Sequence, residues 1–169
     1  SASASPSGGG TQGRHNEQDV MFAQMMIPHH RQAIEMADLA ATHAASAEGK
    51  KLTADIRRAQ DPEIQQLTAW LTGWGATVPA PGTSGMGHMG HGAMDAMMTA
   101  ERMKELEGAE GAAFDRAFLE MMIKHHEGAV AMARAEKASG RFPAARKMAD
   151  DITSSQTAEI TTMRSLLKR

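Results

Sequence analysis

The chain has 169 residues, enough for one well-buried domain, and its net charge of −2 comes without any basic run. This excludes the electrostatic footprint of a nucleic-acid binder, so we expect no nucleic-acid partner. Cysteine is absent, which excludes disulfides and thiolate metal sites. Fifteen methionines against four Phe, two Trp and no Tyr indicate a core of Met, Leu, Ile and Ala, a mixture that favours helices. We expect no transmembrane segment, because no stretch approaches the roughly 20 apolar residues of a helical span.

Residues 1–15 are rich in Ser and Gly and poor in apolar side chains, so we predict a disordered N-terminal tail. A tract of this kind without an initial Met is typical of a mature exported protein whose signal has been removed. We therefore expect an extracytoplasmic location: secreted, periplasmic or lipid-anchored at the cell surface. An arbitrary edge of the chain would give the same picture.

A block of 19 residues occurs twice, as DVMFAQMMIPHHRQAIEMA at residues 19–37 and as DRAFLEMMIKHHEGAVAMA at residues 115–133, with ten identical positions. A shift of 96 residues, which takes Asp19 to Asp115, extends this match without a gap to residues 71 and 167. Each copy has apolar residues at spacings of three and four in two successive segments, the pattern of two amphipathic helices. The sequence predicts two helical hairpins, at residues 16–72 and 112–169, with turns around Gly49 and Gly140.

The hairpins are joined by residues 73–93, whose Gly and Pro content excludes a regular element, and by a short helix at residues 94–107. Twenty extended residues span about 60 Å, twice the length of a 20-residue helix, so this linker can cross the whole bundle. We predict an all-α fold: a single four-helix bundle of two repeated hairpins with a long crossover. If the second and third long helices are parallel, the two histidine pairs face each other near mid-height. An up-down-up-down order is the alternative.

Both copies keep two adjacent histidines, which core packing alone does not require. On a helix, the first histidine of each pair lies within the apolar stripe and the second lies at its edge. Imidazole and thioether together are donors for a soft metal. A hydrogen-bonded core histidine and a gap-filling methionine are the structural alternative. The candidate ligands of the bundle are His29, His30, Met25, Met26 and Met36 in the first copy and His125, His126, Met121, Met122 and Met132 in the second.

The linker region adds a second set of donors on a glycine-rich backbone, where methionine cannot be explained as core. Such a segment suits the capture and transfer of ions better than catalysis, which needs rigid ligands. We predict an auxiliary metal site here, with a compositional accident as the alternative. Its candidate ligands are Met86, His88, Met89, His91, Met94, Met97 and Met98.

The residue types at the spacing of the motif indicate which metal to expect. Di-iron bundles carry Glu-x-x-His on two helices, whereas here the same spacing reads Met26-x-x-His29 and Met122-x-x-His125. A thioether in place of a carboxylate favours copper, with Cu(I) preferred and Cu(II) or Ag(I) as alternatives. We expect polar residues of both segments of each copy to hydrogen-bond the ligand histidines. For the two glutamines, which lie in the apolar stripes of the second segments, the reason is that a buried amide needs a partner, and a cap or a helix-helix hydrogen bond is the alternative. The four polar residues are Asp19, Asp115, Gln60 and Gln156.

The FxxMMIxHHxxAxxMA block and the Gln-x-x-Glu-Ile block that follows each copy resemble the family called domain of unknown function 305. The resemblance covers residues 16–167. It implies a ferritin-like four-helix bundle that is usually exported, with some members binding copper in the periplasm or at the cell surface. It carries the family motif onto His29, His30, Met25, Met26 and Met36 and onto their counterparts His125, His126, Met121, Met122 and Met132.

We therefore expect an exported copper-binding protein that buffers, sequesters or passes the metal, with metal ions and a copper donor or acceptor protein as its partners. No catalytic residue is assigned. Two alternatives remain open. One is a metal-dependent oxidoreductase on the ferritin-like scaffold, for which carboxylate ligands are missing. The other is a helical interaction module without metal that binds a partner helix through an adaptable Met surface.

Overall fold

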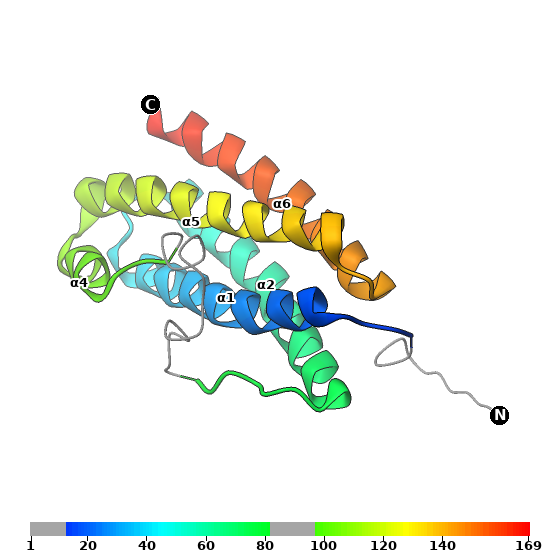
Figure 1. Cartoon of the computed structure of the whole chain (residues 1–169). Coiled ribbons are helices and arrows are strands. Elements are labelled where there is room, and N and C mark those ends of the chain that lie inside the picture. Colours follow the sequence, from blue (N-terminus) through cyan, green and yellow to red (C-terminus); the bar gives the residue numbers. More distant parts are fainter. Residues whose placement is uncertain (1–12, 82–96) are drawn as a thin grey trace.

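The structure, a computed structural model, describes residues 13–81 and 97–169. Four long helices form a bundle (Figure 1), which confirms the predicted all-α fold of two hairpins. None of the described helices is long and apolar enough to span a lipid bilayer. The helices in these two ranges are α1 (Glu17–His43), α2 (Ala47–Trp74), α4 (Ala100–Gly108), α5 (Gly111–Ser139) and α6 (Pro143–Leu167).

The helices α1 and α5 pack side by side and run antiparallel (Figure 1). The end of α1 meets the start of α5, where Ala44 and Gly111 form an isolated bridge. At the opposite end, the side-chain amide of Asn16 donates to the carbonyl of Ser139 at 2.9 Å. Since α1 and α2 are consecutive members of a hairpin, α2 and α5 are parallel. The bundle therefore has the crossover arrangement and not the up-down-up-down order.

An approximate two-fold axis relates the two hairpins, and the aspartates that begin the two repeats show it. Each aspartate holds the turn of the other hairpin at the same place, because the shift of 96 residues takes one pair of turn residues to the other. Hydrogen bonds from N–H groups to a carboxylate are stronger than neutral ones, so these contacts fix the axial position of one hairpin against the other. Backbone N–H groups at 3.0–3.1 Å donate from Arg141 and Phe142 to Asp19 and from Ala45 and Ser46 to Asp115.

Three helix boundaries differ from the sequence predictions, each because of a cap. Gly75, with a φ of +72°, supplies a left-handed C-cap, so α2 continues to Trp74 and does not end at residue 72. Gly49 lies inside α2, because the side chain of Ser46 accepts from its N–H and starts the helix earlier. The short helix α4 begins only after residue 99, whose threonine side chain caps it, and not at residue 94.

The core divides into two apolar clusters, one toward each end of the bundle, which the two-fold axis exchanges. The shift of 96 residues takes Phe22, Met26 and Ile56 to positions in the opposite cluster. Fully burying one such side chain contributes about 1.5–3 kcal/mol. The first core cluster includes Phe22, Met26, Leu67, Trp70, Met132, Phe142 and Ile152, and the second core cluster includes Met36, Ile56, Phe114, Phe118, Met121, Met122 and Met163.

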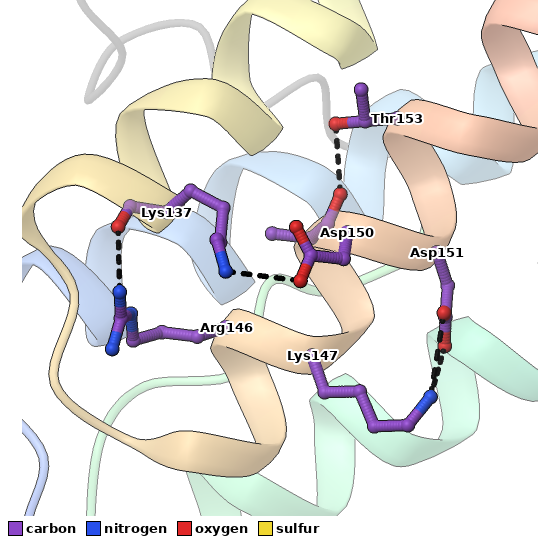
Figure 2. Close-up of polar contacts among 7 residues, drawn as sticks. Lys137, Arg146, Lys147, Asp150, Asp151 and Thr153 are labelled. Atoms are coloured by element: carbon purple, nitrogen blue, oxygen red, sulfur yellow. Dashed lines mark hydrogen bonds and ion pairs between the residues drawn. The ribbon is translucent and has the colours of Figure 1, made fainter.

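Several ion pairs lie on the outer surface of the second hairpin. Figure 2 shows Lys137 of α5 paired with Asp150 of α6, at 3.0 Å, and Lys147 paired with Asp151 one turn along α6. Exposed pairs of this kind contribute about 0–1 kcal/mol each. The two apolar clusters, rather than these surface charges, hold the bundle together.

The two ends of the bundle differ in the surroundings of Glu136. Glu136 of α5 is fully buried, and its carboxyl group contacts that of Asp19. Burial first, and then this contact, raise the pKa of Glu136 to about 9, so the group is protonated at neutral pH. At the other end the repeat places Ala40 where Glu136 would be, and a pocket of about 160 Å³ lies beside Ala40 and Asp115.

Candidate metal centre

Four buried imidazole rings form a layer halfway along the bundle, where α1 packs against α5. His29 and His125, which are equivalent in the repeat, stack on each other with ring centroids 3.6 Å apart and an interplanar angle of 26°. His30 and His126 are fully buried, as are the stacked pair. The expectation that the second histidine of each pair lies at the rim is therefore wrong. A helix considered alone does not reveal what the neighbouring helix covers.

Carboxylates from the neighbouring helices cover these second histidines. The Oε1 atom of Glu63, on α2, lies 2.7 Å from Nε2 of His30, and Oε1 of Glu159, on α6, lies 2.6 Å from Nε2 of His126. Because a carboxylate only accepts, Nε2 carries a proton, and it is then Nδ1 that holds the lone pair whenever the ring is neutral. A histidine held in this way by a carboxylate is oriented to bind a metal ion through its other nitrogen.

We predicted the role of these glutamates for Gln60 and Gln156, three residues earlier on the same helices. Both glutamines are buried, and their Oε1 atoms have no hydrogen-bond partner among the described residues. The predicted site omits Glu63 and Glu159, although the repeat keeps them in register as well. That shared register was the signal that could have identified them.

Four ring nitrogens of the layer are buried without a hydrogen-bond partner within the described part of the chain. Buried polar atoms are almost always hydrogen-bonded, so these nitrogens differ from those of a hydrogen-bonded core histidine. A lone pair on such a nitrogen is available to a metal ion. The four atoms are Nε2 of His29 and Nδ1 of His30, His125 and His126.

The stacked pair is uncharged at neutral pH. The pKa of His29 lies well below its usual 6.5, first because burial disfavours the charged ring and then because the other three imidazoles lie nearby. Burial, followed by His126 and His30, lowers the pKa of His125 in the same way. Neutral rings can stack without charge repulsion, and a neutral ring keeps the lone pair that a metal ligand needs.

Methionine thioethers lie on both sides of the histidine layer, within the two core clusters. Across residues 13–81 and 97–169, no three or more His, Asp or Glu side chains are arranged as a metal site. The donors next to the layer in the two core clusters are thioethers, in addition to the imidazoles of the layer itself. Met26 and Met132 belong to the first core cluster with Met25 packed against it, and Met36, Met121 and Met122 belong to the second.

The remaining predicted site residues lie elsewhere. The hydrogen bonds of Asp19 and Asp115 go to backbone N–H groups at the ends of the bundle, and none of those described goes to a histidine. In the linker, Met97 is buried and Met98 packs against the second core cluster. The other linker donors, Met86, His88, Met89, His91 and Met94, lie outside the described residues.

Gln32 is a residue of the layer that the sequence did not indicate. Its Oε1 atom lies 3.0 Å from Nε2 of His125 and accepts the backbone N–H of Met98 at 2.7 Å. Its Nε2 atom donates to the carbonyl of Met98 at 2.9 Å. The counterpart of Gln32 in the repeat is Gly128, so the internal match gave no signal for it.

Solved structures resemble this chain over most of its length. CopM in its Cu(II)-bound form is 39 % identical, with a TM-score of 0.75 over 89 % of this chain and 95 % of that chain. Its Cu(I)-bound form is 36 % identical, with a TM-score of 0.73 over the same shares. A DUF305 fragment from Deinococcus radiodurans is 29 % identical, with a TM-score of 0.80 over 93 % of this chain and 99 % of that chain.

A DUF305 protein from Streptomyces coelicolor, described as a candidate secreted protein, is 29 % identical, with a TM-score of 0.78 over 89 % of this chain and 91 % of that chain. None of the curated proteins matches. The family model for the domain of unknown function DUF305 matches residues 19–167, which include both hairpins and both histidine pairs. The chain belongs to the DUF305 family.

Proposed function

We propose that this protein binds copper, Cu(I) in preference, at the histidine layer between α1 and α5, and that it buffers, sequesters or transfers the metal outside the cytoplasm. The copper-bound and silver-bound forms of CopM support the choice of metal, since that protein is more than 30 % identical to this chain over nearly its full length. The secreted description of the Streptomyces relative supports the location.

The observation that carries the proposal is the set of four buried ring nitrogens that have no hydrogen-bond partner among the described residues. In His30 and His126 the glutamate bonded to Nε2 fixes the proton there, so Nδ1 is the nitrogen that can bind a metal. A metal ion on Nδ1 makes the opposite N–H a stronger donor, and the bond to the glutamate then strengthens as well. Metal binding would offset the free-energy cost of burying four imidazole rings.

The choice of a soft ion rests on the donors around the layer. Thioethers bind Cu(I) and Ag(I) well and bind hard cations poorly. We propose His29, His30, His125 and His126 as the nitrogen donors, with no more than two of them on one ion because no three of these side chains are arranged as a metal site among the described residues. The remaining ligands of the ion would come from Met25, Met26, Met36, Met121, Met122 and Met132 of the flanking clusters. We propose the linker methionines and histidines as an auxiliary site, from which a donor or acceptor protein exchanges the ion.

The test is an anaerobic titration of the metal-free protein with Cu(I) against a chromophoric competitor. The variant His29→Ala/His125→Ala removes the stacked pair. The matched control, His15→Ala/His43→Ala, removes two imidazoles from outside the layer: His15 stacks on Trp74, and His43 bonds backbone carbonyls near the turn. We expect tight binding by the wild type, a loss of at least about tenfold in the layer variant, and no change in the control.

Three outcomes would contradict the proposal. Unchanged affinity in the layer variant would move the site to the linker. No measurable Cu(I) binding by the wild type would favour an interaction module. Steady oxygen uptake with turnover of a reductant would favour an oxidoreductase.

A further inference from the structure

Gln32 connects the histidine layer to the described end of the linker. Its carboxamide forms hydrogen bonds with both the backbone N–H and the backbone carbonyl of Met98. The same oxygen that accepts from Met98 lies within hydrogen-bond distance of His125. One half-buried side chain therefore touches the docked linker and a site histidine at the same time.

These contacts determine the tautomer of His125. A backbone N–H can only donate and a backbone carbonyl can only accept, so Met98 fixes which end of the Gln32 amide is the oxygen. That oxygen is an acceptor, so Nε2 of His125 must carry the proton. The lone pair of this neutral ring is then on Nδ1, the buried nitrogen without a partner.

The arrangement exists in only one half of the bundle. The position equivalent to Gln32 is Gly128, which has no side chain to bind a histidine or a linker. In His29, the stacked counterpart of His125, the buried nitrogen without a partner is Nε2 instead of Nδ1. The two-fold symmetry of the layer is broken at the point where the linker docks.

We propose that Gln32 is a positioning residue that couples the docking of the linker at Met98 to the tautomer of His125, so that the docked chain presents Nδ1 of His125 to a metal ion. The inference rests on the proposed function for its purpose, but the coupling itself is a property of the metal-free protein. Its consequence is that the amide of Gln32 joins the segment carrying Met97 and Met98 to the layer.

The coupling acts in both directions. An ion on Nδ1 polarises the ring and strengthens the hydrogen bond from Nε2 to Gln32. Coupling free energies are reciprocal, so the ion stabilises the docked backbone of Met98 and the docked backbone raises the affinity for the ion.

The experiment compares the full-length wild type with Gln32→Leu, Gln32→Glu and a matched control, Gln24→Leu. Gln24 also lies on α1 and holds the other side of the linker, through the carbonyl of Thr77 at 2.9 Å, but no histidine contact of Gln24 is described. Imidazole ¹⁵N spectra report the tautomer of His125, and hydrogen exchange reports the protection of the Met98 amide. Both are measured without metal and then with Ag(I) as the probe.

We expect a single Nε2–H tautomer and a protected Met98 amide in the wild type and in Gln24→Leu. Gln32→Leu should give a mixture of tautomers and lose about tenfold or more of the protection. Gln32→Glu should keep the tautomer, because a carboxylate oxygen still accepts, but lose protection because it cannot donate to the Met98 carbonyl. Ag(I) should raise the protection of Met98 in the wild type and not in Gln32→Leu.

A single Nε2–H tautomer in folded Gln32→Leu would overturn the coupling, and so would unchanged protection of Met98 in both Gln32 variants. The proposed function fails separately, if the wild type does not bind Ag(I) although the metal-free spectra show the coupling.

Discussion

Glu136 and Ala40 occupy equivalent positions in the two hairpins, yet only Glu136 brings a carboxyl group into the end of the bundle. The residue that makes room for it is Gly140. A Cβ at position 140 would overlap the carboxyl group of Glu136 and lie 2.7 Å from an oxygen of Asp19. The φ of Gly140 is −75°, a value open to any residue, so the glycine is needed for space and not for its backbone freedom.

The first prediction follows from this contact. Gly140→Ala should lower the free energy of unfolding by about 1–3 kcal/mol, because the added methyl group overpacks the site. Adding Glu136→Ala should restore most of the loss, and urea unfolding of the four members of this double-mutant cycle measures the coupling. Gly108→Ala is the control, since nothing lies within 4 Å of a Cβ there. Additive effects of the two substitutions would show that Glu136 does not require the glycine.

The second prediction concerns pH. The pKa of Glu136 is raised from 4.5 to about 9 on folding. Between these values the unfolded chain is ionised and the folded protein is not, so the folded state binds the extra proton and Glu136 costs more stability as the pH rises. Glu136→Gln, which cannot ionise, should therefore be increasingly more stable than the wild type from pH 5 to pH 9. Urea unfolding at several pH values measures the difference, and a difference that does not change with pH would refute the assignment.

The third prediction tests the carboxylates of the layer. Glu63→Gln or Glu159→Gln should weaken Cu(I) binding by about 10–100-fold, because the histidine is no longer held by a charged acceptor. Glu127→Gln is the matched control: it removes a carboxylate from α5 that pairs only at the surface, with Arg164 at 2.9 Å. The competitor titration described above gives the affinities. Equal affinities in all three variants would exclude the glutamates from the site.

The fourth prediction separates the turn contacts from metal binding. Asp115→Ala should lower the free energy of unfolding by about 1–2 kcal/mol, since two backbone N–H groups lose a charged acceptor. The folded variant should bind Cu(I) as the wild type does. A loss of affinity without a loss of stability would return Asp115 to the role of a histidine partner.

The repeat made much of this architecture predictable. Two copies of one hairpin pattern, joined by a linker long enough to cross the bundle, limited the arrangement to two orders. They also placed His29 opposite His125 in one of those orders. The ends of the helices were harder to predict from the sequence. Caps at Ser46 and Gly75 set the two ends of α2, and the Gly-rich composition nearby does not reveal them.

The site was predicted only in part, for a physical reason. Helical periodicity describes one helix at a time, so it put His30 at the rim and could not include Glu63, which reaches it from the next helix. The contact between Gln32 and Met98 joins residues 66 positions apart and has no copy in the other half. Neither periodicity nor internal comparison contains such information.

The stacked rings of His29 and His125 come from different hairpins, so the proposed ligand set would exist only in the assembled bundle. An ion held by both halves would act as a removable cross-link between them, and separating the hairpins would release it. The thermal stability should then rise with the concentration of the ion. The free energy of unfolding should increase by about 2.7 kcal/mol when the concentration of free ion is a hundred times its dissociation constant. The free energy of unfolding of such a protein rises as its metal site becomes occupied.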